Sequence, residues 1–407
     1  ELTNYEAAWQ KIKSLEQKGL QGTAVQELNQ LLNDAIAQKQ YAQIFKVLAV
    51  RSKYLQQIEE DSEEKIINSF HEAISQSEIE GKRLLQSALA ELYRQYYDQN
   101  QWRISERSNL NDSSRKTITQ MSGEELLERT NELYLLSSSF DARLHGIPLS
   151  DYIEIVSFWN GDSSYLKQFT LADFLANRAL MHFEQQFKQS QLSESILASK
   201  KLFSSKEDFV KHELAKQCLQ AELKNWMKIL TDRLEANENE FSSLHFDLYR
   251  LNVLKSWSTN DSTLDFYENA LNDLIANLNT PSSRDKVRAE KARFLHLSRE
   301  DSKAAIQSCD QCEDPNSVGS YLCEELITNI KRKHHQLQVE AVYPTNQNLL
   351  FSYTYKNIDR AHFRIYQLEP TLEYDDRSFY DQLKDLLKEK TIADWQQDLK
   401  DWGDYRP

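Results

Sequence analysis

The sequence has 407 residues but only 8 Gly and 6 Pro, so few positions can interrupt a helix. With 40% hydrophobic and 28% charged residues, it is typical of a folded chain that can bury a core without disulfides or metals. The net charge of −14 would repel a phosphate backbone, which disfavours nucleic acid as a partner, and no apolar run approaches the roughly 20 residues of a membrane-spanning helix.

Apolar residues spaced three and four positions apart predict paired helices over residues 1–104. After a break at residues 19–22, Thr23 is expected to cap a helix. The acidic residues at 59–64 are expected to end one helix and begin the next, because negative charge is favoured at a helix N-terminus. The expected helices include residues 24–36, 44–58 and 79–99.

Residues 105–120 carry several serines and no apolar stripe, so we expect a linker there. Ser122 with Glu125 resembles a capping box, and Thr170 with Asp173 is expected to begin another helix. The helical pattern then continues through the region 121–335. Further helices are expected at residues 171–187, from 213 onward, and at 244–257, 264–278 and 284–309.

Helical hairpins of about 35 to 45 residues predict a tetratricopeptide-like solenoid, although no strict tetratricopeptide consensus recurs. After Arg332 the apolar spacing changes to the alternation of strands, at residues 337–342, 349–355 and 361–366, with a turn at 356–359. We therefore expect a mainly α chain in which residues 336–407 begin a β-sandwich that is incomplete, with a helical insertion at 377–389.

The common catalytic and nucleotide-binding motifs are absent: the sequence has no GxSxG, HExxH, GxxxxGK[ST] or GxGxxG. His334 and His335 follow a basic run at the end of an expected helix, where positive charge offsets the helix dipole. We therefore predict no catalytic residue, no metal site and no cofactor.

An aromatic cluster, Tyr93, Tyr96, Tyr97 and Trp102, is the candidate interaction surface. Its helical spacing is also typical of rings packed between helices, so both interpretations stand. Exposure of one of these rings beside polar residues would favour the surface.

Four segments, found in one order along the chain, match the pattern of a known family. They are Leu89–Tyr97 with Trp102 and Arg107, Thr170–Leu180 with Phe183, Pro315 with Ser317, Gly319 and Cys323, and Tyr353–Tyr366 with Trp395 and Gly403–Tyr405. These segments resemble the N-terminal region of the large bacterial alpha-2-macroglobulin-like envelope proteins of the Bacteroidota type.

The resemblance implies a helical arm that leads into macroglobulin-like sandwiches within a longer chain of the cell envelope, in the periplasm or at the outer membrane. That chain would be peripheral to the membrane, tethered by a lipid anchor outside this segment, and its parent protein would be a protease inhibitor or an envelope-assembly factor. Protein partners, or later domains of the same chain, are then expected. None of Cys218, Cys309, Cys312 and Cys323 begins a Cys-x-Glu-Gln thioester.

Cys309, Cys312 and Cys323 admit several interpretations: a redox dithiol, a zinc set completed by His334, a structural disulfide, or reduced buried thiols. If the expected helices form a hairpin with its tip at residues 314–319, Cys309 and Cys323 lie equally far from the tip and face each other. A Cys309–Cys323 disulfide is therefore expected, with Cys312 as the alternative partner. The oxidising envelope implied by the resemblance would let the bond persist.

Two functions follow. The first is a non-catalytic scaffold and interaction arm of a larger envelope protein, with the chain ending inside a sandwich at residues 402–407. The alternative is a stand-alone adaptor or ligand-binding protein of the tetratricopeptide type.

Overall fold

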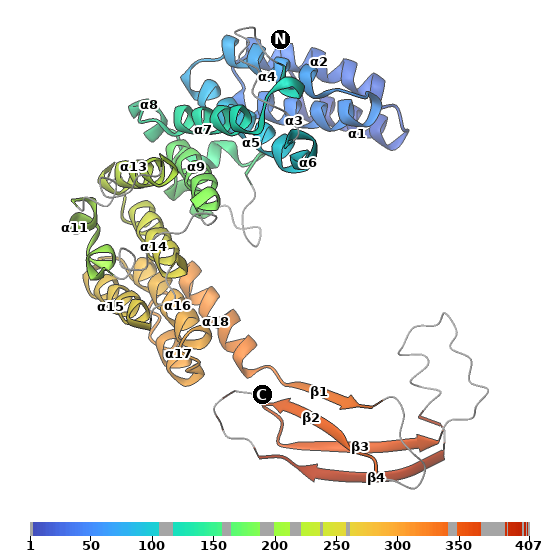
Figure 1. Ribbon diagram of the computed structural model, residues 1–407, viewed down its shortest axis with the longest axis vertical. Coiled ribbons are helices and arrows are strands. Elements are labelled where there is room, and N and C mark those ends of the chain that lie inside the picture. The colour runs from blue at the N-terminus through green and yellow to red at the C-terminus, as the bar shows by residue number, and fades with distance from the viewer. Residues whose placement is uncertain are drawn as a thin grey trace. The chain divides into compact units, whose positions relative to one another are not determined.

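The computed structural model describes residues 3–105, 117–156, 164–187, 199–211, 221–236, 239–257, 261–340, 348–367, 387–388, 390–400, 403 and 405. The chain divides into two compact units, Glu1–Ala270 and Leu271–Pro407. Their described residues are mainly helical, and short antiparallel strands follow near the C-terminal end (Figure 1). The predicted mainly α class is therefore confirmed.

Helices build the first unit. The α-helices are α1 (Tyr5–Gln17), α2 (Gln21–Ala37), α3 (Tyr41–Ile58), α4 (Glu63–Gln76), α5 (Ile79–Gln99), α6 (Gln101–Ile104), α7 (Gly123–Ser138), α8 (Ala142–His145), α9 (Leu171–Phe187), α11 (Lys206–Val210), α13 (Ala221–Ala236), α14 (Glu240–Trp257) and α15 (Asp261–Asn277), which crosses the boundary. Short 3-10 turns are η1 (Ile118–Gln120), η2 (Leu149–Tyr152), η4 (Ser164–Gln168) and η5 (Lys200–Phe203). Neighbours in sequence pack together, as α1 with α2 and α2 with α3 do.

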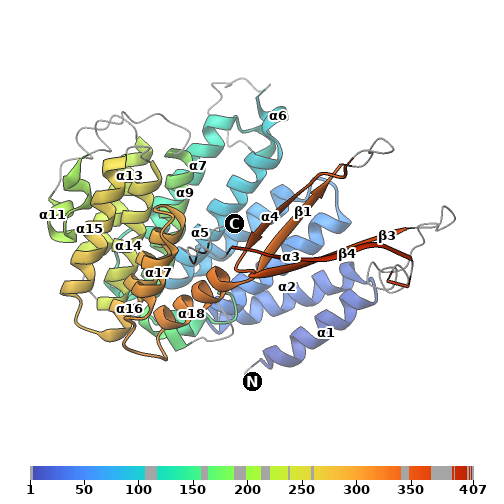
Figure 2. The ribbon, with the colours of Figure 1, turned by 90° about the horizontal axis from the view of Figure 1, so that it is seen from below.

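The core of the first unit lies between helices that are distant in sequence. α5 packs against α7, α7 against α9, and α9 against α13; α5, α7 and α9 lie together in both views (Figures 1 and 2). Leu89, Leu126, Leu175 and Leu230, one from each of these helices, have no exposed surface. Burial of such side chains, worth about 1.5 to 3 kcal/mol each, is the main force that holds the four helices together.

Local capping explains where several of these helices begin. Ser122 and Glu125 form the expected capping box at the start of α7, with the Ser122 Oγ accepting from the Glu125 amide at 3.2 Å. The expected cap at Thr23 was wrong. Instead α2 begins at Gln21, three residues earlier than expected, with Leu20 as its cap, because Gly19 takes a left-handed conformation (φ +70°) and turns the chain there.

The helices of the second unit are α16 (Pro281–Leu297), α17 (Ser302–Cys309) and α18 (Val318–Lys331), and each contacts the other two. The single helix expected over residues 284–309 is in fact two helices. Glu300 adopts φ +53°, which breaks the helix, and the Asp301 side chain then accepts from the Ala304 amide to cap α17.

Strands follow α18 after two residues. β1 (His334–Val339) pairs antiparallel with β2 (Phe351–Lys356), and β3 (Arg360–Gln367) pairs antiparallel with β4 (Lys390–Asp398). His334 and His335 therefore belong to a strand and not to a helix end, and the strand region starts two residues before the expected residue 336. Most of the expected helical insertion at 377–389 lies outside the described residues.

Aromatic side chains join the two strand pairs. The rings of Phe363 and Trp395 stack with centroids 5.2 Å apart, and Phe351 and Tyr353 lie 5.3 and 5.1 Å from Phe363. Such ring pairs are worth about 0.5 to 1.5 kcal/mol beyond their burial. They give the described strands a common hydrophobic side.

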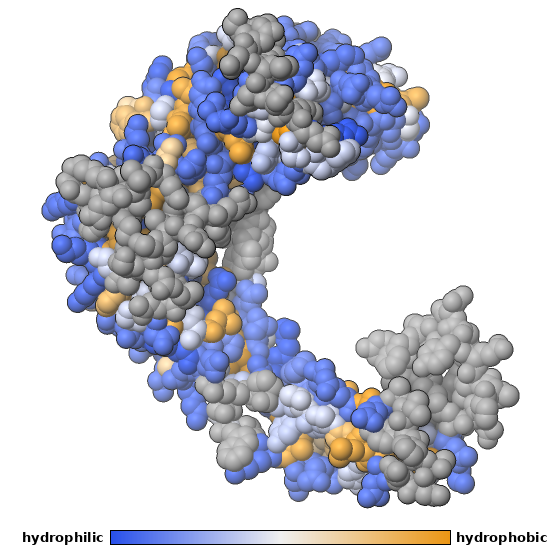
Figure 3. All heavy atoms as spheres, viewed as in Figure 1, coloured by the Kyte–Doolittle hydropathy of each residue, from blue (hydrophilic) through white to orange (hydrophobic). Residues whose placement is uncertain are grey.

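The face of the described residues seen in Figure 3 is mostly hydrophilic, with hydrophobic residues in small separate patches. No helix in the described part of the chain combines the length and the apolar character that crossing a membrane requires.

Candidate interaction sites

The four aromatic residues of the predicted surface lie in different environments. Tyr93 on α5 is 5% exposed and belongs to the core, whereas Tyr96 and Tyr97 are half-buried. Trp102 on α6 is 66% exposed. The core interpretation therefore fits Tyr93, and Trp102 is the member of the cluster that a partner could contact.

A hollow of about 300 Å³ lies beside Tyr97. It is lined by Tyr97, Gln101, Ile104, Ser105, Ser122, Gly123 and Glu124. Gly123 keeps this wall close-packed, since a Cβ there would sit 3.2 Å from both Ile104 and Tyr97. The lining mixes an aromatic ring with hydroxyl, amide and carboxylate groups, which suits a polar peptide better than a purely apolar ligand.

Cations lie over the half-buried ring of Tyr97 and the exposed ring of Trp102. The Arg94 guanidinium is 5.8 Å from the Tyr97 ring centre, and the Arg103 guanidinium is 5.2 Å from that of Trp102. Arg94 also pairs with Asp98 at 2.9 Å. The surface around Tyr97 and Trp102 therefore offers rings together with charges of both signs.

A second cavity, of about 240 Å³, lies against Tyr93 on the inner side of α5. Its lining includes Glu64, Asn68 and His71 of α4 together with Ile118. The Ile118 amide donates to the Glu64 carboxylate at 3.3 Å, which holds η1 against α4. This cavity is thus part of the packing between α4, α5 and η1.

A buried ion pair that the sequence did not reveal fixes α9 to α13 and α14. The Asp173 carboxylate receives the Arg233 guanidinium, the Ser242 hydroxyl at 2.9 Å and the Thr170 amide at 2.8 Å. Asp173 is 2% and Arg233 is 6% exposed. Loss of either partner would leave a buried charge alone, which costs about 3 to 5 kcal/mol.

Polar contacts also tie α9 to α5, and α5 to α7. The Arg178 side chain donates to the Ser87 hydroxyl at 2.8 Å, and Glu91 accepts from the Tyr134 hydroxyl at 2.8 Å. Burial, with the nearby Glu91 carboxylate, raises the pKa of Tyr134 above its ordinary value. These groups hold the helices in register.

His182 is the most perturbed histidine of the described residues. It is 4% exposed, stacks on Tyr134 with ring centres 4.5 Å apart, and shares a 2.7 Å hydrogen bond with Asn131. Burial, assisted by Arg94, lowers the pKa of His182 to about 3, so the ring is neutral at pH 7. Enclosed in this way, the neutral ring packs between α7 and α9.

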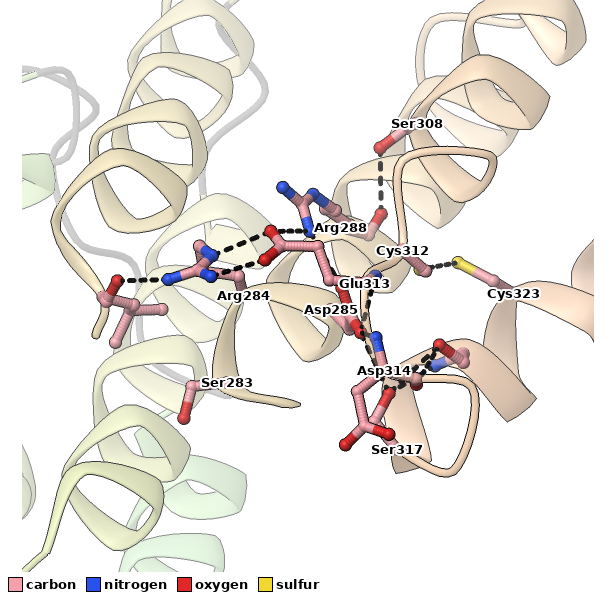
Figure 4. Close-up of polar contacts among 12 residues, drawn as sticks. Ser283, Arg284, Asp285, Arg288, Ser308, Cys312, Glu313, Asp314, Ser317 and Cys323 are labelled. Atoms are coloured by element: carbon pink, nitrogen blue, oxygen red, sulfur yellow. Dashed lines mark hydrogen bonds and ion pairs between the residues drawn. The ribbon is translucent and has the colours of Figure 1, made fainter. Parts of the chain in front are cut away.

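The loop between α17 and α18 is organised by one buried carboxylate (Figure 4). Asp285 on α16 has no exposed surface and accepts from the Glu313 amide at 2.9 Å, the Asp314 amide at 2.8 Å and the Ser317 hydroxyl at 3.2 Å. Arg288 balances its charge at 2.9 Å. A side chain on α16 thereby fixes the path of the loop between α17 and α18.

Ser317 and Gly319 then set the start of α18. The Ser317 hydroxyl caps the helix by accepting from the Ser320 amide at 3.0 Å. A Cβ on Gly319 would overlap with the backbone of Asp285 and Lys286, so only glycine lets α18 approach α16 this closely.

Three thiols gather behind this loop. Cys309 and Cys323 are 4% and 2% exposed, Cys312 is half-buried, and the Cys312 and Cys323 sulfurs lie 3.6 Å apart. The Cys323 thiol also interacts with Cys309, so it lies near both of the partners expected from the sequence. In the described part of the chain, no three His, Cys, Asp or Glu side chains are arranged to hold a metal ion.

A single asparagine connects the strands to the end of α18. Asn357, in the turn between β2 and β3, adopts φ +56° and donates to the carbonyl oxygens of Ile330 at 2.8 Å and Arg332 at 3.1 Å. Because the helix ends here, no backbone N–H of a following turn donates to these carbonyl oxygens. The Asn357 amide supplies the missing donor. The strand region of this unit is thereby attached to its helices.

Comparison of the chain with protein-family models, with curated proteins and with solved structures finds no match.

Proposed function

We propose that the chain is a non-catalytic scaffold and interaction arm of a larger alpha-2-macroglobulin-like protein of the cell envelope. Its helices would form a tetratricopeptide-like solenoid, and its strands would begin a macroglobulin-like sandwich. The parent protein would lie in the periplasm or at the outer membrane, held by a lipid anchor outside this segment. Its partners would be other proteins or later domains of the same chain.

The strongest support comes from the residues that carry the resemblance, because several of them hold helices together. Ser317 and Gly319 position α18 against Asp285, and Thr170 and Asp173 build the buried ion-pair site of α9. A scaffold needs such joints between helices, whereas an enzyme needs a reactive group that substrate can reach.

The surface of Tyr97 and Trp102 supports a protein partner. Interfaces between proteins are enriched in exposed aromatic and arginine side chains, and Trp102 with Arg103 provides both. The small hollow beside Tyr97 would take one side chain of such a partner.

Two assays test the proposal. The purified chain alone should not cleave a general peptide substrate. Incubated with an active protease, it should form no covalent adduct with that protease. A covalent adduct, or hydrolysis that co-purifies with the chain, would contradict the non-catalytic role.

The second assay is affinity capture from an envelope extract. Trp102→Ala should reduce the affinity for the partner at least tenfold. Loss of an aromatic anchor typically costs about 2 kcal/mol or more, and about 1.4 kcal/mol corresponds to a tenfold change in the dissociation constant. Phe140→Ala is the matched control, because Phe140 is 67% exposed but lies outside the predicted surface. Equal loss for both variants would show nonspecific adhesion.

Capture from a cytosolic extract tests the alternative. The exposed ring of Trp102, together with the hollow lined by Tyr97 and other residues, also suits a stand-alone adaptor of the tetratricopeptide type. A partner that depends on Trp102 and comes only from the cytosolic extract would favour the adaptor.

A further inference from the structure

We propose that Cys312 and Cys323 are a disulfide-forming pair that locks the loop between α17 and α18. Their sulfurs are 3.6 Å apart, so they need to close by only about 1.5 Å to reach the length of an S–S bond. Cys312 lies in the loop and Cys323 in the second turn of α18 (Figure 4).

Cys309 is the competing partner, because it also interacts with the Cys323 thiol. It is the last residue of α17 and is 4% exposed, so its backbone is held by helical hydrogen bonds and its sulfur is shielded from an oxidant. Cys312 follows that helix and is half-buried. Because the Cys312 sulfur already lies 3.6 Å from that of Cys323, a small movement of the Cys312 side chain brings the two sulfurs together.

The bond requires an oxidant, for which a small disulfide such as oxidised glutathione suffices. The Cys312 thiolate attacks it, which forms a mixed disulfide and releases one glutathione thiol. The Cys323 thiolate then attacks the Cys312 sulfur and releases the second glutathione. Two cysteine thiols are oxidised, one disulfide is reduced, and both protons leave with the two glutathione molecules.

Burial makes this reaction slow in the reduced folded chain. Burial, with the neighbouring Cys323 thiol, raises the pKa of the Cys312 thiol to about 12. A hydrogen bond with Cys309, together with burial, raises the pKa of the Cys323 thiol. Thiolate is therefore scarce at neutral pH, and the bond is expected to form mainly during folding or when the loop opens.

The expected consequence is a fixed attachment of α18. The covalent ring would contain Asp314 and Ser317, which bond the buried Asp285, and Gly319, which touches its backbone. Oxidation would therefore hold the loop on the carboxylate that already organises it, and reduction would release only the covalent link.

Peptide mapping of the whole chain tests the assignment. The chain is refolded with oxidised and reduced glutathione, its free thiols are alkylated, and it is digested without reduction. We expect a Cys312–Cys323 peptide pair that has lost two hydrogens, and two of the four cysteines alkylated. A Cys309–Cys323 or Cys309–Cys312 link, a mixed glutathione disulfide that does not close, or four alkylated cysteines would overturn the proposal.

Matched variants separate the bond from general effects on folding. Cys309→Ser should keep the Cys312–Cys323 link and the rise in midpoint temperature on oxidation. Cys312→Ser and Cys312→Ala should lose both while retaining the helical circular-dichroism spectrum of the reduced protein. An oxidative rise in midpoint temperature that persists in both Cys312 variants would contradict the assignment.

Discussion

At the scale of single residues, Asp285 and Gly319 determine how α18 meets α16. The Asp285 carboxylate accepts from two backbone amides and one hydroxyl while fully buried, and Arg288 supplies the opposite charge. Gly319 provides the space for the approach. The contact between α16 and α18 thus depends both on the hydrogen bonds to Asp285 and on the absence of a side chain at Gly319. Each contribution can be tested separately.

Gly319→Ala should destabilise the chain by about 1 to 3 kcal/mol, because the new methyl group would overlap with backbone that cannot move as a side chain does. Urea unfolding followed by circular dichroism measures the loss. Gly22→Ala is the control: Gly22 lies in α2 with nothing within 4 Å of its Cβ position, so this change should stabilise α2 by up to about 1 kcal/mol. Equal effects of the two changes would contradict the steric account.

His182 should make the stability of the first unit depend on pH. Its pKa is about 3 when folded and returns to the ordinary 6.5 when unfolded, so the unfolded chain binds the extra proton between these values. The free energy of unfolding should therefore fall by up to about 1.4 kcal/mol per pH unit as pH drops below 6.5. Urea titrations between pH 7 and 4.5 measure this slope. That pH interval lies above the range in which most carboxylates titrate.

His182→Gln should flatten that slope, while His334→Gln, an exposed position on β1, should leave it unchanged. A slope that is the same in all three proteins would rule out His182 as its source.

At the scale of elements, the contact between Asn357 and the end of α18 attaches the strands of the second unit to its helices. The asparagine combines a left-handed backbone with two bonds to helix-end carbonyls. Asparagine suits both tasks, because its short side chain tolerates positive φ and carries an amide donor.

Two substitutions separate these tasks. Asn357→Gly keeps the backbone conformation but removes both hydrogen bonds, at an expected cost of about 1 to 2 kcal/mol. Asn357→Ala should cost about 1 kcal/mol more, since alanine is also strained at φ +56°. Thermal unfolding, and hydrogen exchange at β2 and β3, report the loss. If alanine is tolerated as well as glycine, the left-handed strain does not contribute.

Sequence patterns predicted the helix starts and helix spans that depend on neighbouring residues. The capping box of Ser122 and the span of α5 follow from neighbouring residues, and both agree with the structure. The start of α2 and the break at Glu300 were missed, because one depends on a left-handed glycine and the other on a residue that usually favours helices.

The candidate sites were less predictable than the helices. The Asp173–Arg233 pair joins residues 60 positions apart, and the Asp285 loop joins residues 28 or more apart, so no local pattern reveals them. The thiol cluster was predicted as a set, but the approach of Cys312 to Cys323 depends on the path of the loop between α17 and α18. For the aromatic cluster, spacing alone could not distinguish the buried Tyr93 from the exposed Trp102.

At the scale of the whole molecule, the proposal is that a helical arm holds proteins and does not act on them. Its described buried ion pairs are enclosed between helices, and the first unit carries both an exposed tryptophan, Trp102, and a hollow lined by Tyr97. Under this proposal, exposed residues such as Trp102 contact partners, and the buried ion pairs stabilise the helices.

Photo-crosslinking in the source cells tests this proposal most directly. A photoreactive amino acid replaces Trp102 in the full-length protein, and in a parallel strain it replaces Phe140, which is equally exposed. The proposal predicts one specific crosslink from position 102, to an envelope protein or to a later segment of the same chain, and none of that kind from position 140. The same crosslinks from both positions, or no protein crosslink from position 102, would contradict it.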